Sequence, residues 1–164
     1  MGYIETSAAL PVIYNVINAV GLNCPNHRDD VKLVQYLLLN RYKNVQPKGA
    51  TPKGEMKVDG ICGGVTINWI NKFQIDIMFA HRSIMADKRV DRIRNAATLT
   101  GDISKTTYTL GWLNWLVAYF EPEAFAKLPL FVSLANPMEV PPPGIDIVVP
   151  APPPEIMIPV TGGI

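Results

Sequence analysis

The stretch VDGICGGVTINWINKFQ, residues 58–74, contains residue types found in phosphate-binding loops and in metal sites. A P-loop follows the pattern G-x-x-x-x-G-K-S/T, because its glycine-rich backbone and its lysine together hold the phosphates. The segment GICGGVT has a different glycine spacing and no lysine, which excludes a P-loop. Cys62 has no partner at the sequence spacing of zinc ligands. Neither chemistry therefore accounts for these residues.

Cys24, Cys62, His27 and His81 are the cysteines and histidines of the chain. A zinc amidase or peptidase would need two or three histidines with carboxylates, and these two histidines lie far apart in the sequence. A Cys–His pair for nucleophilic catalysis has no recognisable motif around it. The cysteines are either buried free thiols or a single disulfide, Cys24 to Cys62, that would require an oxidising compartment. We expect no metal and no cofactor.

Paired carboxylates would be enough for a glycosidase, provided that they lie about 5–9.5 Å apart. The candidates are Glu55, Asp59, Glu121 and Glu123. Asp59 is already explained by a tight turn with Gly60, and the two acids of EPE by the start of a helix. The length of 164 residues also leaves no room for a separate catalytic domain. We predict that the protein is not an enzyme.

Two helices must position the 58–74 stretch, and the first is expected over about residues 29–42. Asp29 or Asp30 is suited to cap its start, and acidic residues in the first turn complement the helix dipole. Apolar residues recur at helical spacing along RDDVKLVQYLLLNRY, which indicates one face packed on the core. This face comprises Val31, Val34, Leu37 and Leu38.

The second helix is expected from about Val65 to Met78, after a loop rich in Pro, Gly and Lys and a turn in which Gly60 supplies a positive φ. A basic, polar connector follows over residues 81–105. YTLGWLNWLVAYF then predicts a buried helix and EPEAFAKLPLFVSLA a short one. The apolar face of the second helix comprises Ile67, Ile70, Phe73 and Ile77.

DDVKLVQYLLL followed by VDGICGGVTINWINKFQ resembles the peptidoglycan-binding-like domain, a three-helix module that binds cell walls. The family pattern is V-x-x-L-Q-x-x-L on one helix, a loop, and then D-G-x-x-G-x-x-T-x-x-A-V-x-x-F-Q. ADKRVD and TLGWLN resemble the continuation of a longer variant, with Lys88 where glycine is usual. The resemblance extends over roughly residues 20–116. The matching residues lie on the first helix (Val31, Val34, Gln35, Leu38), on the turn (Asp59, Gly60, Gly63, Thr66) and on the closing helix (Ile70, Phe73, Gln74).

The resemblance implies a mainly α fold, a small three-helix bundle with additional C-terminal helices and an extended Pro-rich tail. We expect residues 1–20 to form an N-terminal arm, residues 21–136 the helical domain and residues 137–164 the tail. The motif residues have structural roles in this interpretation, because Asp59 and Gly60 build the turn and Thr66 caps or steadies the closing helix. The motif thus identifies the fold rather than the ligand.

Trp69 departs from the family pattern, which usually has a small residue at this position. The indole either enters a rearranged core or emerges as a platform for a sugar ring or a partner. Burial is the default for a tryptophan. Together with Tyr36 and Tyr42, Trp69 is our candidate for ligand binding, because aromatic rings stack on sugars.

The composition changes in the last part of the chain. Nine of the 15 prolines lie within residues 137–159, and such a run favours extended polyproline geometry. The rest of the chain holds all 15 basic residues and is mildly basic. An extended tail of this kind is suited to bind a protein partner. The tail has no Lys or Arg and carries −3 from Glu139, Asp146 and Glu155.

The resemblance implies a non-catalytic peptidoglycan-binding module. The start of the chain lacks a basic segment and has Glu5 where a secretory signal would have Lys or Arg. We therefore expect a phage or a secretion apparatus to bring the protein to the wall or the periplasm. The alternative is a structural component of a virion or contractile-injection assembly that reuses the fold for protein contacts through its tail.

Two classes of partner are not expected. The longest apolar runs are shorter than the roughly 20 residues needed to span a bilayer, so we expect no membrane span. The net charge of +1 gives no general argument for nucleic acid. The basic cluster at residues 81–94 is interpreted as a solvated face, so no nucleic-acid partner is expected.

Overall fold

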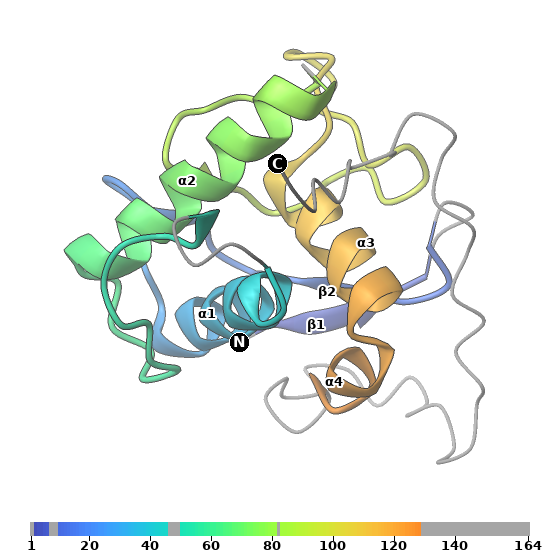
Figure 1. Ribbon diagram of the computed structural model, residues 1–164. Helices are drawn as coiled ribbons and strands as arrows, with labels where there is room; N and C mark the ends of the chain where they lie inside the picture. The colour runs from blue at the N-terminus through green and yellow to red at the C-terminus, as the bar shows by residue number, and fades with distance from the viewer. Residues whose placement is uncertain (1, 7–9, 46–49, 82, 129–164) are drawn as a thin grey trace.

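The computed structural model describes residues 2–6, 10–45, 50–81 and 83–128, and this part of the chain is mainly helical (Figure 1). The expected mainly α class is confirmed. The expected Pro-rich tail lies outside the described residues. The helices described are α1 (Arg28–Tyr42), α2 (Gly64–His81), α3 (Thr109–Phe120) and α4 (Pro122–Ala126). The strands are β1 (Tyr3–Glu5), β2 (Ile13–Asn15), β3 (Val20–Gly21) and β4 (Arg89–Val90).

The helices expected from the apolar spacing are confirmed within a few residues of their ends. The expected cap of α1 is corrected, because its N-cap residue is His27 and no side chain caps the helix. Buried Asp30 instead accepts hydrogen bonds from the backbone N–H groups of Ile17 (3.1 Å) and Asn18 (3.0 Å). Its carboxylate thus ties the preceding segment to the first turn of α1.

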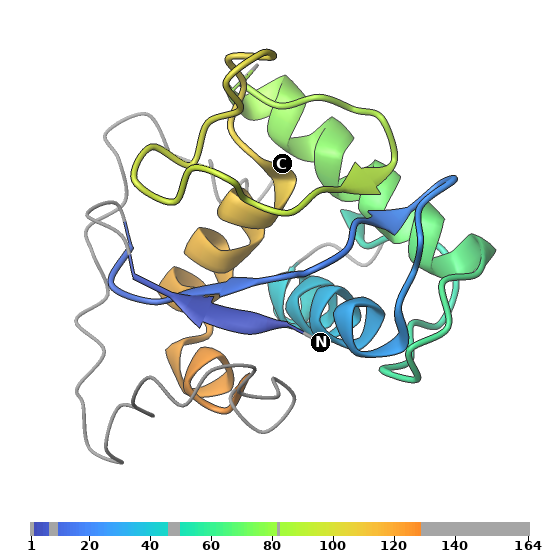
Figure 2. The same cartoon turned by 180° about the vertical axis from the view of Figure 1, so that it is seen from behind.

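α1 lies between α2 and α3 and packs against both, while α4 packs on α3. Figure 1 shows α1 nearly end-on, with α2 crossing above it and α3 beside it. The antiparallel β1–β2 hairpin crosses the back of the helices as seen in Figure 1, so it lies in front of them in Figure 2, and β2 contacts α3. A second pairing joins β3 to β4, with Gly21 opposite Arg89. This pairing holds the chain before α1 against the connector that follows α2.

The segment that we expected to form an N-terminal arm is packed into the core where the structure describes it. Ile13, Tyr14 and Val20 each expose 2% of their surface or less. The side-chain amide of buried Asn114 on α3 accepts from the Tyr14 N–H (2.7 Å) and donates to the Tyr14 carbonyl (3.0 Å). Residues 10–20 therefore share one hydrophobic core with the helices.

Gln35 on α1 holds the turn that leads into α2. Its Nε2 donates to Asp59 Oδ1 (3.0 Å) and to Thr66 Oγ1 (3.1 Å). It also donates to the Ile61 carbonyl (3.1 Å), while its Oε1 accepts from the Gly60 N–H (2.9 Å). These bonds satisfy a side chain that is only 1% exposed. We call this set the first glutamine network.

Gln74 on α2 holds the next turn in the same way. Its Nε2 donates to Asp87 Oδ1 (3.0 Å) and to Thr109 Oγ1 (3.0 Å). It also donates to the Arg89 carbonyl (2.8 Å), while its Oε1 accepts from the Lys88 N–H (2.7 Å). Gln74 is fully buried. We call this set the second glutamine network.

The two networks have the same construction. In each, a glutamine from one helix binds an aspartate, the two residues after it and a threonine at the start of the next helix. The aspartate also accepts from the N–H two residues later, at 2.8 Å in the first network and 3.0 Å in the second. The middle residue of the turn has φ +78° at Gly60 and +62° at Lys88. The fold therefore contains the same glutamine-to-turn hydrogen-bond arrangement twice.

Lys88→Gly is expected to raise the free energy of unfolding by up to about 1 kcal/mol. A left-handed backbone costs a non-glycine residue about 1–2 kcal/mol, and glycine removes this cost. The greater freedom of glycine in the unfolded chain offsets about 0.5–1 kcal/mol of the gain in stability. The Lys88 side chain is exposed, so little packing is lost. Chemical denaturation checks the result, with Lys57→Gly as the control at an exposed lysine that has no positive φ. Equal destabilisation by both changes would contradict it.

Candidate functional site

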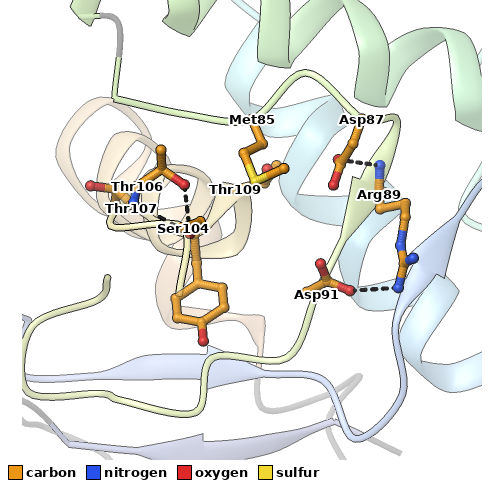
Figure 3. Close-up of a pocket in the computed structure, with 9 residues that line it drawn as sticks. Met85, Asp87, Arg89, Asp91, Ser104, Thr106, Thr107 and Thr109 are labelled. Atoms are coloured by element: carbon orange, nitrogen blue, oxygen red, sulfur yellow. Dashed lines mark hydrogen bonds and ion pairs between the residues drawn. The ribbon is translucent and has the colours of Figure 1, made fainter. Parts of the chain in front are cut away.

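A small polar pocket lies between the connector after α2 and the loop that precedes α3 (Figure 3). Its cavity volume is about 60 Å³. Hydroxyl groups dominate the lining, together with two carboxylates, one guanidinium and one thioether. The lining residues are Met85, Asp87, Arg89, Asp91, Ser104, Thr106, Thr107, Tyr108 and Thr109.

The second glutamine network builds one wall of this pocket. Asp87 and Thr109 line the pocket and are both held by Gln74. Arg89 contributes its backbone N–H to Asp87 (3.0 Å), and its guanidinium binds the Asp91 carboxylate (3.1 Å; Figure 3). The carboxylates are therefore held in place by internal hydrogen bonds and an ion pair.

The opposite wall is a tight turn rich in hydroxyl groups. Ser104 Oγ accepts from Thr106 Oγ1 (2.9 Å) and from the Thr106 N–H (3.3 Å). Backbone bonds from the Gly101 N–H to the Thr106 carbonyl (2.9 Å) and from the Lys105 N–H to the Gly101 carbonyl (3.0 Å) close the turn. The Thr107 N–H donates to the Ser83 carbonyl (3.0 Å) and so fixes this turn against the other wall.

The size and chemistry of the pocket set what it can bind. Pockets for whole small molecules have volumes of about 300–1,000 Å³, and this cavity of about 60 Å³ is much smaller. It can take one small polar group, such as an acetamido or hydroxymethyl group, because hydroxyls both donate and accept hydrogen bonds. Within the described residues, no cluster of three or more His, Cys, Asp or Glu could hold a metal ion.

The structure places the three expected ligand-binding aromatics away from this pocket. Trp69 is 7% exposed, and its indole N–H donates to the Gly54 carbonyl (3.0 Å). Tyr42 is 5% exposed, stands edge-on to Trp69 and donates its hydroxyl to Asp76 (2.7 Å). Burial, and then the hydrogen bond to Asp76, raises the pKa of Tyr42. Neither ring offers an open face to a sugar, so neither enters the function proposed below.

Tyr36 is half-buried and donates its hydroxyl to the Ala124 carbonyl (2.9 Å). This contact joins α1 to α4. Burial raises the pKa of Tyr36. The role that the structure gives to this side chain is therefore to hold two helices together.

The motif residues are found mainly in packing and in the two networks. Thr66 belongs to the first turn inside α2, which begins at Gly64, and its hydroxyl accepts from Gln35. The Ile61 N–H, and then Gln35, lower the pKa of Asp59. A Cβ on Gly63 would meet no atom within 4 Å, and nothing in the structure explains glycine there. The buried apolar members are Val31, Val34, Leu38, Ile70 and Phe73.

Cys24 and Cys62 are both half-buried free thiols in this structure. The Cys24 N–H donates to the Gly21 carbonyl (3.3 Å), and the Cys24 thiol lies within hydrogen-bonding distance of the Leu22 carbonyl (3.4 Å). Burial raises the pKa of both thiols. A disulfide between them stays a prediction.

Comparison with family models, with curated proteins and with solved structures gives no match. The resemblance described above therefore rests on the quoted residues alone. The sequence reasoning missed the pocket, although ADKRVD contributes Asp87, Arg89 and Asp91 to it. The run SKTTYT, residues 104–109, was the available signal, because five of its six residues line the pocket.

Proposed function

We propose that the described domain is a non-catalytic peptidoglycan-binding module, with α1, α2 and α3 as its three-helix bundle. The observation that carries this proposal is the pair of glutamine networks. They give a physical role to Gln35, Asp59, Gly60, Thr66 and Gln74, which are residues of the family pattern. The second network also forms one wall of the pocket.

The pocket suits the acetamido group that the sugars of peptidoglycan carry. Its volume of about 60 Å³ fits a group of that size. The Ser104 hydroxyl, which accepts from Thr106, can donate to the acetamido carbonyl, and Thr106 Oγ1 can accept from the acetamido N–H. Met85 is 50% exposed and offers an apolar surface to the methyl group.

The same features favour binding over catalysis. A glycosidase needs one carboxyl group that can donate a proton and room for the scissile bond between two carboxylates. Asp87 accepts hydrogen bonds from Gln74 and Arg89, and Asp91 is paired with Arg89. The cavity is also too small for two sugar rings.

A second candidate function, a structural part of a virion or contractile-injection assembly, is favoured by apolar side chains on the surface. Phe79 on α2 is 80% exposed, Ile61 is 68% exposed and Ile103 is 98% exposed. Large apolar side chains with this much exposed surface are available for contacts with another protein. No described helix has the length and apolar character needed to cross a bilayer.

Retention on insoluble peptidoglycan sacculi tests the first proposal. We expect saturable co-sedimentation of the full-length chain, and about tenfold weaker binding of the double variant Ser104→Ala, Thr106→Val, because two hydrogen bonds of about 0.5–1.5 kcal/mol each are lost. Thr98→Val is the matched control, because Thr98 is an exposed hydroxyl of the same connector outside the pocket. Absence of retention of the full-length chain would overturn wall binding and leave the assembly role as the candidate.

A further inference from the structure

The turn before α2 contains the one Asp-Gly pair of the sequence, formed by Asp59 and Gly60. Glycine has no side chain to shield its backbone nitrogen, so this nitrogen can attack the carboxyl carbon of a preceding aspartate. The attack joins the Gly60 nitrogen to Asp59 Cγ, and the amide proton and the carboxyl hydroxyl leave as water. Water then opens the resulting succinimide at either carbonyl, which gives aspartate or isoaspartate. The reaction needs no oxidant and no cofactor.

The fold requires both residues of this pair. Gly60 has φ +78°, and a Cβ there would lie 2.4 Å from Arg28 Cγ and 2.8 Å from the Arg28 carbonyl oxygen. Asp59 Oδ1 accepts from the Ile61 N–H (2.8 Å), which closes the turn. Asp59 is also exposed, so water reaches its carboxyl group. The reactive pair is therefore built into the turn and open to solvent on one side.

Gln35 bonds both of the groups that would react. Its Oε1 accepts from the Gly60 N–H (2.9 Å), so the attacking nitrogen keeps its proton, and its Nε2 donates to Asp59 Oδ1 (3.0 Å). The Ile61 N–H, and then Gln35, lower the pKa of Asp59, and an ionised carboxylate is a poorer electrophile than the neutral acid. Gly60 and Gln35 are both buried. Ring closure therefore requires a local opening that breaks the bonds to Gln35.

The second glutamine network has the same bonds without the labile pair. Asp87 is followed by Lys88, which has φ +62° and an exposed side chain. Gln74 binds the Asp87 carboxylate (3.0 Å) and the Lys88 N–H (2.7 Å). A side chain on the residue after the aspartate hinders attack by its nitrogen. The chain thus contains a labile and a resistant version of one arrangement.

We propose that the Asp59–Gly60 pair is a site of spontaneous isoaspartate formation and that Gln35 suppresses this reaction in the folded protein. Isoaspartate inserts the Asp59 methylene group into the backbone, so the turn loses the bonds that Asp59 makes to Gln35 and to the Ile61 N–H. The modification therefore releases the start of α2 from α1. The turn and Gln35 share no residue with the pocket, so this protection goes beyond wall binding and does not depend on it.

Isoaspartate formation in a full-length Lys88→Gly chain tests the proposal, because this change places a second Asp-Gly pair under Gln74. Each site is then the internal control for the other. The folded protein is incubated at neutral pH, and peptide mass spectrometry with electron-transfer fragmentation follows isoaspartate at Asp59 and Asp87. We expect Gln35→Met to accelerate the reaction at Asp59 at least about tenfold, because two hydrogen bonds to the reacting groups are lost, and to leave Asp87 unchanged. Gln74→Met should do the reverse.

Methionine has nearly the length of glutamine and makes neither hydrogen bond, so the cavity left by the change is small. An unchanged rate at Asp59 in Gln35→Met would overturn the proposal. Equal acceleration at Asp59 and Asp87, in a variant that keeps its circular dichroism spectrum, would also overturn it, because global unfolding exposes both sites alike.

A comparison of the Lys88→Gly chain in buffer and in urea needs no glutamine variant, and it decides the matter if Gln35→Met does not fold. We expect isoaspartate to form at least about tenfold more slowly at Asp59 in the folded protein than in urea, because the reaction requires local opening. Equal rates in buffer and in urea would show that the network gives no protection.

Discussion

Gln35→Ala is expected to lower the free energy of unfolding by about 3–5 kcal/mol, which is a large loss for a single substitution. The side chain is 1% exposed and is bonded to the Gly60 N–H, the Ile61 carbonyl and the side chains of Asp59 and Thr66. Alanine would leave buried polar groups of the turn unpaired, each at a cost of about 1–3 kcal/mol, and would also open a cavity.

Chemical denaturation followed by circular dichroism measures this loss. Gln74→Ala should have a similar effect, because the second network makes the same set of bonds. Asn68→Ala is the control, since Asn68 is an exposed amide on α2. A loss of less than about 1 kcal/mol for Gln35→Ala would show that the network contributes no more than an ordinary hydrogen bond.

Gly21→Ala is expected to lower the free energy of unfolding by at least about 3 kcal/mol. Gly21 has φ +126°, and a Cβ there would lie 2.2 Å from the Lys88 carbonyl oxygen and 3.0 Å from Arg89 Cα. Both are backbone atoms, one in β4 and one in the residue just before it, so no side-chain rotation relieves the clash. The Leu22 N–H also bonds that same carbonyl (3.0 Å), which fixes it in place.

Thermal unfolding compares this variant with Gly63→Ala. A Cβ at Gly63 would meet no atom within 4 Å, and its φ is not positive. This control should change stability by no more than about 1 kcal/mol. Similar melting temperatures for the two variants would contradict the close approach of β3 to β4.

The sequence predicted the helices well because their apolar residues recur at helical spacing. It also predicted the structural role of Gln35, Asp59 and Gly60 through the family pattern. Burial of Trp69 followed from the default for tryptophan, and the structure shows that its N–H finds the Gly54 carbonyl. These features depend on local sequence or on a known motif.

The remaining features depend on contacts between distant residues. Gln74 binds Thr109, 35 residues away, and nothing in the local sequence indicates this pairing. Asn114 binds the backbone of Tyr14, 100 residues away, which is why the N-terminal segment joins the core. The hydroxyl groups of the pocket belong to a polar segment in which apolar residues do not recur at a regular spacing, so the sequence does not indicate that they lie together. Tyr42 was expected to bind ligand because aromatic rings stack on sugars. Its burial was not predicted, because it depends on contacts with Trp69 and Asp76 of another helix.

An NMR titration of the full-length protein with soluble peptidoglycan fragments tests the central claim most directly. The proposal predicts saturable chemical-shift changes at backbone amides of Ser104, Thr106, Arg89 and their neighbours around the pocket, and their loss in the Ser104→Ala, Thr106→Val variant. The absence of any shift, or shifts confined to residues outside the pocket, would contradict the account.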